Sequence, residues 1–136
     1  PFCAGLLGEQ GAEVIKVEQP GTGDPLRQLG PFVDGPEGPY SLYWAVEGRG
    51  RKSVTLDLRT PRGQEVFRDL AGHADVVCEN FRPGTLEKWG IGPDVLEEVN
   101  PELILVRISA FGQTGPLSAR PGCNVLFSKV INKALK

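Results

Sequence analysis

The chain has 136 residues, of which 40% are hydrophobic and 24% charged, and its formal net charge is −2. These values are typical of one soluble globular domain that is large enough to bury a core. A charge this close to zero argues against nucleic acid and anionic membranes as partners, so an anionic ligand would need a local basic cluster.

The three cysteines, Cys3, Cys78 and Cys123, are too widely spaced to indicate a disulfide framework or a zinc site. Cys78 lies in an apolar run, which predicts a buried side chain. No set of residues has metal-ligand spacing. No signal peptide or membrane-spanning apolar stretch is present, so we expect a cytoplasmic location.

The first half of the chain predicts a helix, a strand and a long excursion. Residues 1–10 read as the later part of a helix that stops near Gly8 or Gly11, so we expect the chain to be a fragment of a longer subunit. The β-branched run over residues 12–18 predicts a strand. Residues 20–50 are rich in proline and glycine and predict a surface excursion, with a short helix near residues 41–46.

The second half of the chain alternates strands and helices. Thr60 and Pro61 form a helix start, Val66, Phe67 and Leu70 mark one apolar face, and Gly72 ends the helix. The other predicted elements are strands over residues 53–58, 74–79 and 103–108, and short helices over 84–90 and 93–99. This alternation predicts an α/β fold with a Rossmann-like, open, mainly parallel sheet and flanking helices, incomplete at both ends.

The last residues, 123–136, form a segment of different character. Its apolar side chains recur at helical spacing, which predicts an amphipathic helix that packs on the sheet or meets a partner. The residues of that stripe are Phe127, Val130, Ile131, Ala134 and Leu135.

Ligands of open α/β sheets lie beyond the carboxyl ends of the strands. The four predicted strand ends, near residues 18–20, 58–60, 80–82 and 109–111, carry guanidinium, amide and aromatic groups that suit a nucleotide-like ligand with phosphates. Arg59, at a strand end, is a better candidate for a ligand contact than the basic run 49–52.

Several other polar groups near the strands have two interpretations. The basic run 49–52 and the turn 80–84 are each as consistent with an ordinary loop as with a phosphate contact. Glu18 stands where a dinucleotide-binding unit keeps its ribose-binding acid, but the preceding glycines do not form a GxGxxG motif. His73 is interpreted as a polar group at a helix end.

Four ordered segments carry a family resemblance. Residues 11–24 (GAEVIKVEQPGTGD), 51–63 (RKSVTLDLRTPRG), 74–84 (ADVVCENFRPG) and 108–116 (ISAFGQTGP) are similar to motifs of the class III CoA-transferases. That group includes formyl-CoA transferase, carnitine CoA-transferase and α-methylacyl-CoA racemase. The resemblance runs from Pro1 to about Gly122.

The resemblance implies a domain that binds coenzyme A (CoA). It implies interlocked homodimers that act on an acyl-CoA and a small carboxylic acid, with CoA as substrate and no prosthetic group. Where the family commonly has an arginine beyond the first strand, this chain has Gln19, which removes a positive charge. The residues that the resemblance assigns to CoA are Gln19, Leu56, Asp57, Leu58, Arg59, Asn80, Phe81, Arg82 and Lys88.

The resemblance also implies where the chemistry lies. The family moves CoA through an acyl intermediate on an aspartate, which we expect beyond Lys136, so this chain should contain no catalytic residue and be inactive alone. Residues 1–122 would form a partial CoA-binding domain and 123–136 a divergent tail. The alternatives are a racemase-like fragment, which Cys123 in place of the racemase histidine disfavours, a non-catalytic CoA-binding or interaction remnant, and a nicotinamide-binding domain.

Overall fold

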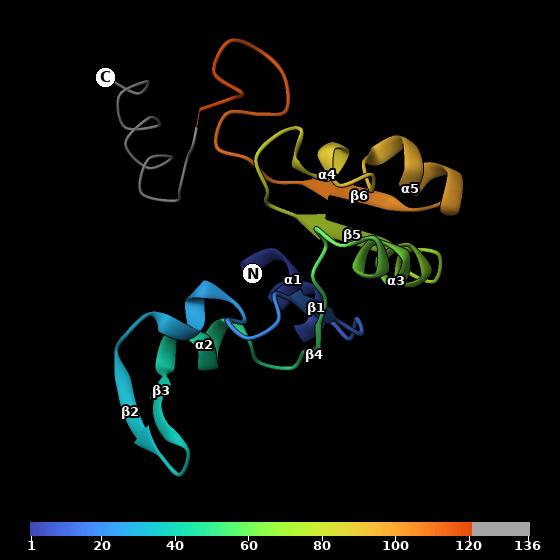
Figure 1. Ribbon diagram of the computed structural model, residues 1–136. Helices are drawn as coiled ribbons and strands as arrows, with labels where there is room; N and C mark the ends of the chain where they lie inside the picture. Colours follow the sequence, from blue (N-terminus) through green and yellow to red (C-terminus); the bar gives the residue numbers. More distant parts are fainter. Residues whose placement is uncertain (121–136) are drawn as a thin grey trace. The chain divides into compact units, whose positions relative to one another are not determined.

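The computed structural model describes residues 1–120, which form two compact units divided after Gly63 (Figure 1). The α/β class predicted from the sequence is confirmed: short helices alternate with strands, and the four predicted strands form two parallel pairs. The predicted amphipathic tail, residues 123–136, lies outside the described residues.

The first unit contains two helices, a 3₁₀ helix and four strands. In chain order these are α1 (Phe2–Glu9), β1 (Ile15–Glu18), η1 (Pro25–Gln28), β2 (Phe32–Gly35), β3 (Gly38–Ser41), α2 (Leu42–Glu47) and β4 (Lys52–Thr55). Strands β1 and β4 are parallel, with Glu18 opposite Thr55. Both strands therefore end at the same edge.

An antiparallel hairpin, β2–β3, stands within the segment that the sequence predicts as a surface excursion. Its strands are joined at Gly35–Gly38, and Gly38 has a φ of 111°, which a side chain would strain. Phe32, Val33 and Tyr40 on the hairpin are exposed. Only part of the proline and glycine that predicts an irregular loop lies at this turn, namely Gly35, Pro36, Gly38 and Pro39.

The predicted short helix after the hairpin is confirmed as α2, and a serine begins it. The backbone N–H of Trp44 donates to Ser41 Oγ over 3.0 Å, and the Ser41 hydroxyl donates in turn to the Leu29 carbonyl. Ser41 and Trp44 are both buried, so this cap ties α2 to the segment that follows η1.

The second unit contains α3 (Pro61–Ala71), which starts just before its boundary, β5 (Val76–Glu79), α4 (Thr85–Lys88), α5 (Pro93–Val99) and β6 (Ile104–Arg107). Strands β5 and β6 are parallel, with Glu79 opposite Arg107. Helices α3 and α5 lie on opposite sides of this pair (Figure 1). The core consists of Phe67, Ala71, Leu86, Ile91 and Leu96.

The predicted start of α3 is confirmed in detail. Thr60 Oγ1 accepts from the Gly63 N–H over 3.1 Å and donates to the Asp57 carbonyl over 2.8 Å. Gly63 is buried against Asp57, and a Cβ at this position would overlap the Asp57 carbonyl, only 2.7 Å from its carbon. Glycine is therefore required where the helix packs on the turn after β4.

The predicted burial of Cys78 is wrong for the described residues, because its side chain is exposed. Successive side chains of a strand point to opposite faces. On β5 the pattern leaves Val76 and Cys78 exposed on one face, whereas Glu79 is buried. An apolar run predicts the strand correctly but does not predict which of its faces is covered.

Candidate functional site

The ends of β1 and β4 lie side by side in the first unit. The Leu56 N–H donates to the Glu18 carbonyl over 2.9 Å, one residue beyond the strand pairing. Gln19 and the turn 56–59 therefore begin at the same edge. Gln19 is exposed, and its side chain makes no hydrogen bond within residues 1–120.

The turn after β4 holds an ion pair. Arg59 Nε and Nη2 donate to the two Asp57 carboxylate oxygens over 2.8 and 3.0 Å, and the Arg59 N–H donates to the same carboxylate. The hydrogen bonds from Arg59 lower the pKa of Asp57 and raise that of Arg59. The Arg59 side chain is exposed and Asp57 is half-buried, so the pair orients a guanidinium at the strand end and leaves it open to a ligand. Leu56 and Leu58 are half-buried on either side of Asp57.

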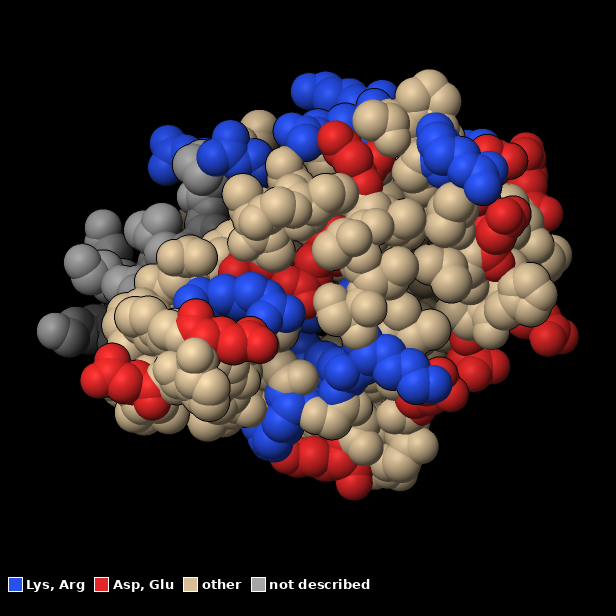
Figure 2. All heavy atoms as spheres, turned by 60° about the horizontal axis from the view of Figure 1, so that its bottom comes forward, with Lys and Arg blue, Asp and Glu red and all other residues tan. Residues whose placement is uncertain are grey.

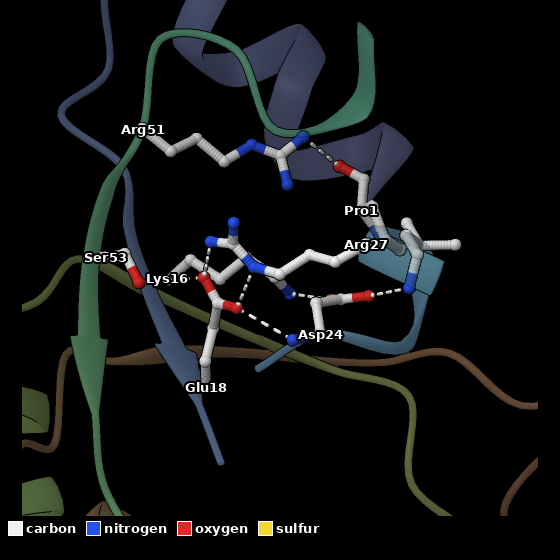
Figure 3. Close-up of polar contacts among 8 residues, drawn as sticks. Pro1, Lys16, Glu18, Asp24, Arg27, Arg51 and Ser53 are labelled. Atoms are coloured by element: carbon white, nitrogen blue, oxygen red, sulfur yellow. Dashed lines mark hydrogen bonds and ion pairs between the residues drawn. The ribbon is translucent and has the colours of Figure 1, made fainter. Parts of the chain in front are cut away.

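A buried carboxylate, Glu18, lies beneath this edge (Figure 3). Both its oxygens accept from the Arg27 guanidinium over 2.8 Å, and the Ser53 hydroxyl and the Asp24 N–H each donate to it over 2.8 Å. The Arg27 hydrogen bonds outweigh the effect of burial and lower the pKa of Glu18 from 4.5 to about 2. The carboxylate is thus ionised at neutral pH, its two oxygens are engaged by four donor groups, and it is not free for a ribose.

The partners of Glu18 are themselves fixed. The Arg27 guanidinium stacks over the Trp44 ring, 4.0 Å from its centroid. Asp24 pairs with Lys16 over 2.6 Å and accepts from the Leu26 N–H over 2.8 Å, which caps η1. Through these contacts the loop that follows β1 is held at both its start and its end.

The basic run before β4 is engaged elsewhere in the first unit. Arg49 pairs with Glu9, Arg51 Nη2 donates to the Pro1 carbonyl over 2.6 Å, and Lys52 pairs with Glu13 over 2.5 Å. These residues stand at the amino end of β4, opposite Arg59. Of the two interpretations left open by the sequence, the contacts favour a structural loop.

The second unit also brings two strand ends together. The Ile108 N–H donates to the Glu79 carbonyl over 2.9 Å, beyond the paired strands β5 and β6. Asn80, Phe81 and Arg82 follow β5 and are exposed. Within the described part of the chain, the Asn80 and Arg82 side chains make no hydrogen bond or ion pair. An amide and a guanidinium are thus presented together at one edge.

The backbone of this turn is less available than the sequence suggests. The Phe81 N–H donates to Glu79 Oε2 over 2.6 Å, so it is not open to a phosphate. The Phe81 ring meets the Trp89 ring edge to face, with 5.1 Å between centroids. Lys88, the last residue of α4, is exposed, and its side chain makes no hydrogen bond or ion pair within residues 1–120.

A chain of charges underlies the same turn. The carboxylate of the buried Glu79 accepts from Arg107 Nε over 2.7 Å, and Arg107 Nη1 donates to Glu87 of α4 over 2.7 Å. The hydrogen bonds from Arg107 lower the pKa of Glu87, and both carboxylates raise that of Arg107. Sequence reasoning missed Glu79 and considered Glu18 only as a ribose-binding acid, although each ends an apolar strand and is buried.

Other predictions concern the wider surface. His73 Nδ1 lies 2.8 Å from the Asp69 carbonyl, as expected for a group at a helix end. Residues 1–120 contain no cluster of histidine, cysteine and carboxylate groups suited to a metal ion. Among them, no helix is long and apolar enough to cross a membrane. Basic and acidic side chains intermingle on the face shown in Figure 2.

Comparison with known proteins extends these findings. The model of CoA-transferase family III matches residues 1–131. The chain is 56% identical over 123 residues to the succinyl-CoA–L-malate CoA-transferase beta subunit of Chloroflexus aurantiacus, and 41% identical over 130 residues to the human succinyl-CoA:glutarate CoA-transferase. These matches cover 90% and 96% of the chain but only 29% of each relative.

Solved structures agree with the sequence comparison. A CAIB/BAIF family protein from Brucella suis superposes with a TM-score of 0.89 at 40% identity, over 96% of this chain and 34% of that one. The chain thus spans about three tenths of the length of its curated relatives, and it belongs to CoA-transferase family III.

Proposed function

We propose that this chain contributes the CoA-binding part of a class III CoA-transferase, which moves CoA between an acyl-CoA and a carboxylic acid. The observation that carries the proposal is the joint exposure of Asn80 and Arg82 beyond β5, in a member of a family that acts on CoA thioesters. An amide and a guanidinium are suited to the phosphates and the adenine of CoA.

The remaining contacts follow the same logic. In the first unit we assign CoA contacts to Gln19 and to Leu56, Asp57, Leu58 and Arg59. In the second we assign them to Asn80, Phe81, Arg82 and Lys88. The Arg59 guanidinium is oriented by Asp57 yet 56% exposed, which leaves donors for a phosphate. Lys88 supplies a point charge that no described residue neutralises.

We infer succinyl-CoA as the acyl donor and a small dicarboxylic acid as the acceptor. The basis is the names of relatives: the proteins with 56% and 41% identity are named for succinyl-CoA with L-malate and with glutarate. The racemase-like alternative has no such support among those two names.

The two buried carboxylates of the described strand ends, Glu18 and Glu79, do not suit the nucleophilic role. Glu18 is locked by Arg27 with its pKa near 2, and Glu79 is held by Arg107 and the Phe81 N–H. A carboxylate with its lone pairs committed to hydrogen bonds is a poor nucleophile. The proposal therefore keeps the catalytic aspartate outside this chain, with residues 1–122 as part of a Rossmann-like domain in a cytoplasmic, interlocked homodimer.

The test is calorimetric titration of the intact protein with CoA and succinyl-CoA. We expect Arg82→Gln and Arg59→Gln each to weaken binding about tenfold, because one charge-assisted hydrogen bond is worth roughly 1.5–3 kcal/mol. Arg49→Gln is the matched control, since Arg49 lies at the opposite end of β4 from Arg59 and pairs with Glu9.

Three results would count against the proposal. The first is that the wild-type protein binds neither succinyl-CoA nor free CoA. The second is that the control variant Arg49→Gln weakens binding as much as the two site variants. The third is that wild type binds CoA but neither site variant changes the affinity, in which case the assignment of Arg59 and Arg82 as CoA contacts is wrong.

A further inference from the structure

The turn that presents Asn80 and Arg82 has its conformation set by a buried group. Glu79 is only 7% exposed, and its two oxygens accept from two different donors. Oε2 takes the Phe81 N–H over 2.6 Å, and Oε1 takes Arg107 Nε over 2.7 Å. The hydrogen bond from the Phe81 N–H fixes the backbone in the middle of the exposed segment 80–82.

The second donor extends this control to the next helix. Arg107 stands opposite Glu79 on β6, and its guanidinium bridges to Glu87 over 2.7 Å through Nη1 and 3.3 Å through Nη2. Glu87 belongs to α4 and precedes Lys88. One guanidinium therefore joins the end of β5, β6 and the helix that carries the basic side chain.

The exposed residues have few other restraints. Within residues 1–120, the side chains of Asn80, Arg82 and Lys88 make no hydrogen bond or ion pair, and α4 has only four residues. The Phe81–Trp89 ring contact, the hydrogen bond from the Thr85 N–H to the Arg82 carbonyl and the buried Leu86 side chain also hold the turn and α4. Glu79, Arg107 and Glu87 add the side-chain hydrogen bonds that join the turn, α4 and β6.

We propose that Glu79 and Arg107 are positioning residues for CoA: they hold the turn 80–82 and Lys88 in the geometry that receives the ligand, without touching it themselves. This inference rests on the proposed function, since it concerns the same ligand. A preformed site loses less conformational freedom on binding, so relaxing it weakens affinity.

The first unit contains the same arrangement on different residues. Glu18 also ends a parallel strand, is buried, and accepts both from a guanidinium and from a backbone N–H of the loop that follows, in this case that of Asp24. The same arrangement at two strand ends supports the inference that Glu18 and Glu79 each shape the loop that follows the strand.

The decisive variant is Glu79→Gln in the intact protein. Both neighbours of the carboxylate are N–H donors, and an amide has only one oxygen to accept from them. We expect the Kd for CoA to rise about tenfold, which corresponds to about 1.4 kcal/mol. In the longer subunit that supplies the catalytic aspartate under the proposed function, the KM for acyl-CoA should rise by a similar factor while kcat changes less than about twofold, because the loss is in ligand binding.

Arg107→Lys is a second variant, in case the first does not fold. A single ammonium group cannot reproduce the two-sided bridge of the guanidinium, so CoA affinity should fall in the same direction. Glu13→Gln is the control, since it removes an exposed carboxylate–lysine pair in the other unit. Thermal melts identify the temperature at which all variants are folded, and binding is measured there.

The outcomes separate this inference from the function on which it rests. Wild-type binding that is weakened in Glu79→Gln and Arg107→Lys but not in Glu13→Gln supports it. Wild-type binding with unchanged affinity in both folded variants overturns the positioning role and leaves the proposed function standing. No binding of CoA by the wild-type protein overturns both.

Discussion

Replacing Glu18 by glutamine should remove a pH-dependent part of the stability of the first unit. In the native state Arg27 lowers the pKa of Glu18 from 4.5 to about 2. A tenfold change in a dissociation constant corresponds to about 1.4 kcal/mol, which would give about 3 kcal/mol for this group. Because the Arg27 side chain is 37% exposed, solvent screens the pair, and we expect about 2 kcal/mol.

The pH dependence of this contribution has a definite sign. A carboxyl group whose pKa is lower in the folded state stabilises the protein fully above its unfolded pKa, near 4.5. The contribution is then lost as the pH falls from about 4.5 to about 2. The stability difference between wild type and Glu18→Gln should therefore be constant from pH 7 to 5 and shrink steadily below that.

The assay is denaturant unfolding of both proteins at pH 7, 5, 4 and 3, with hydrogen exchange of the Asp24 amide as a local readout. That amide donates to Glu18 Oε2 and should exchange faster in the variant. Glu13→Gln is the control, because its carboxylate is exposed. Equal stability of wild type and Glu18→Gln at pH 7, or a difference that persists unchanged to pH 3, would refute the reasoning.

Three further predictions concern the first unit and the start of α3. Gly63→Ala should lower the melting temperature by several degrees and weaken CoA binding, because a Cβ there overlaps the Asp57 carbonyl; an unchanged melt would contradict this. Thr60→Ala should cost about 1 kcal/mol in denaturant unfolding through loss of the helix cap, and Thr60→Ser should restore most of it. Trp44→Leu should lower stability by about 1 kcal/mol or more, because it removes the ring beneath Arg27; near-ultraviolet circular dichroism and unfolding curves check that loss.

Local signals in the sequence predict the helices well. Thr60 and Pro61 start α3 as expected, and α5 has the predicted bounds, Pro93–Val99. Helix caps act over three or four residues, so a short stretch of sequence contains the information. The strands were predicted in the right order, but each is four residues long where the apolar runs cover six or seven. Apolar runs do not specify where backbone pairing stops.

Features that depend on which residues pair were missed. The hairpin β2–β3 lies in a segment whose proline and glycine content predicts a loop, and the pairing of Phe32–Gly35 with Gly38–Ser41 reveals it. Glu79 and Arg107 are 28 residues apart, and nothing in either neighbourhood predicts their contact. A carboxylate that ends an apolar strand is a usable signal, because burial there requires a cationic partner.

The sequence predicts which residues of the candidate site lie together, but it does not predict their side-chain contacts. Parallel pairing puts strand ends at one edge, so the grouping of Gln19 with residues 56–59 follows from the order of the strands. The engagement of Asp57 with Arg59 and the occupation of the Phe81 N–H depend on side-chain geometry, which the sequence does not specify.

The placement of the two tryptophans has a practical consequence. Trp44 lies beneath the Arg27 guanidinium in the first unit, and Trp89 meets the Phe81 ring in the second. Indole emission responds to nearby charge and to solvent, so each unit has its own intrinsic fluorophore beside a strand-end loop. With either tryptophan replaced by phenylalanine, the fluorescence of the remaining tryptophan would report ligand binding at the loop beside it, without an attached dye.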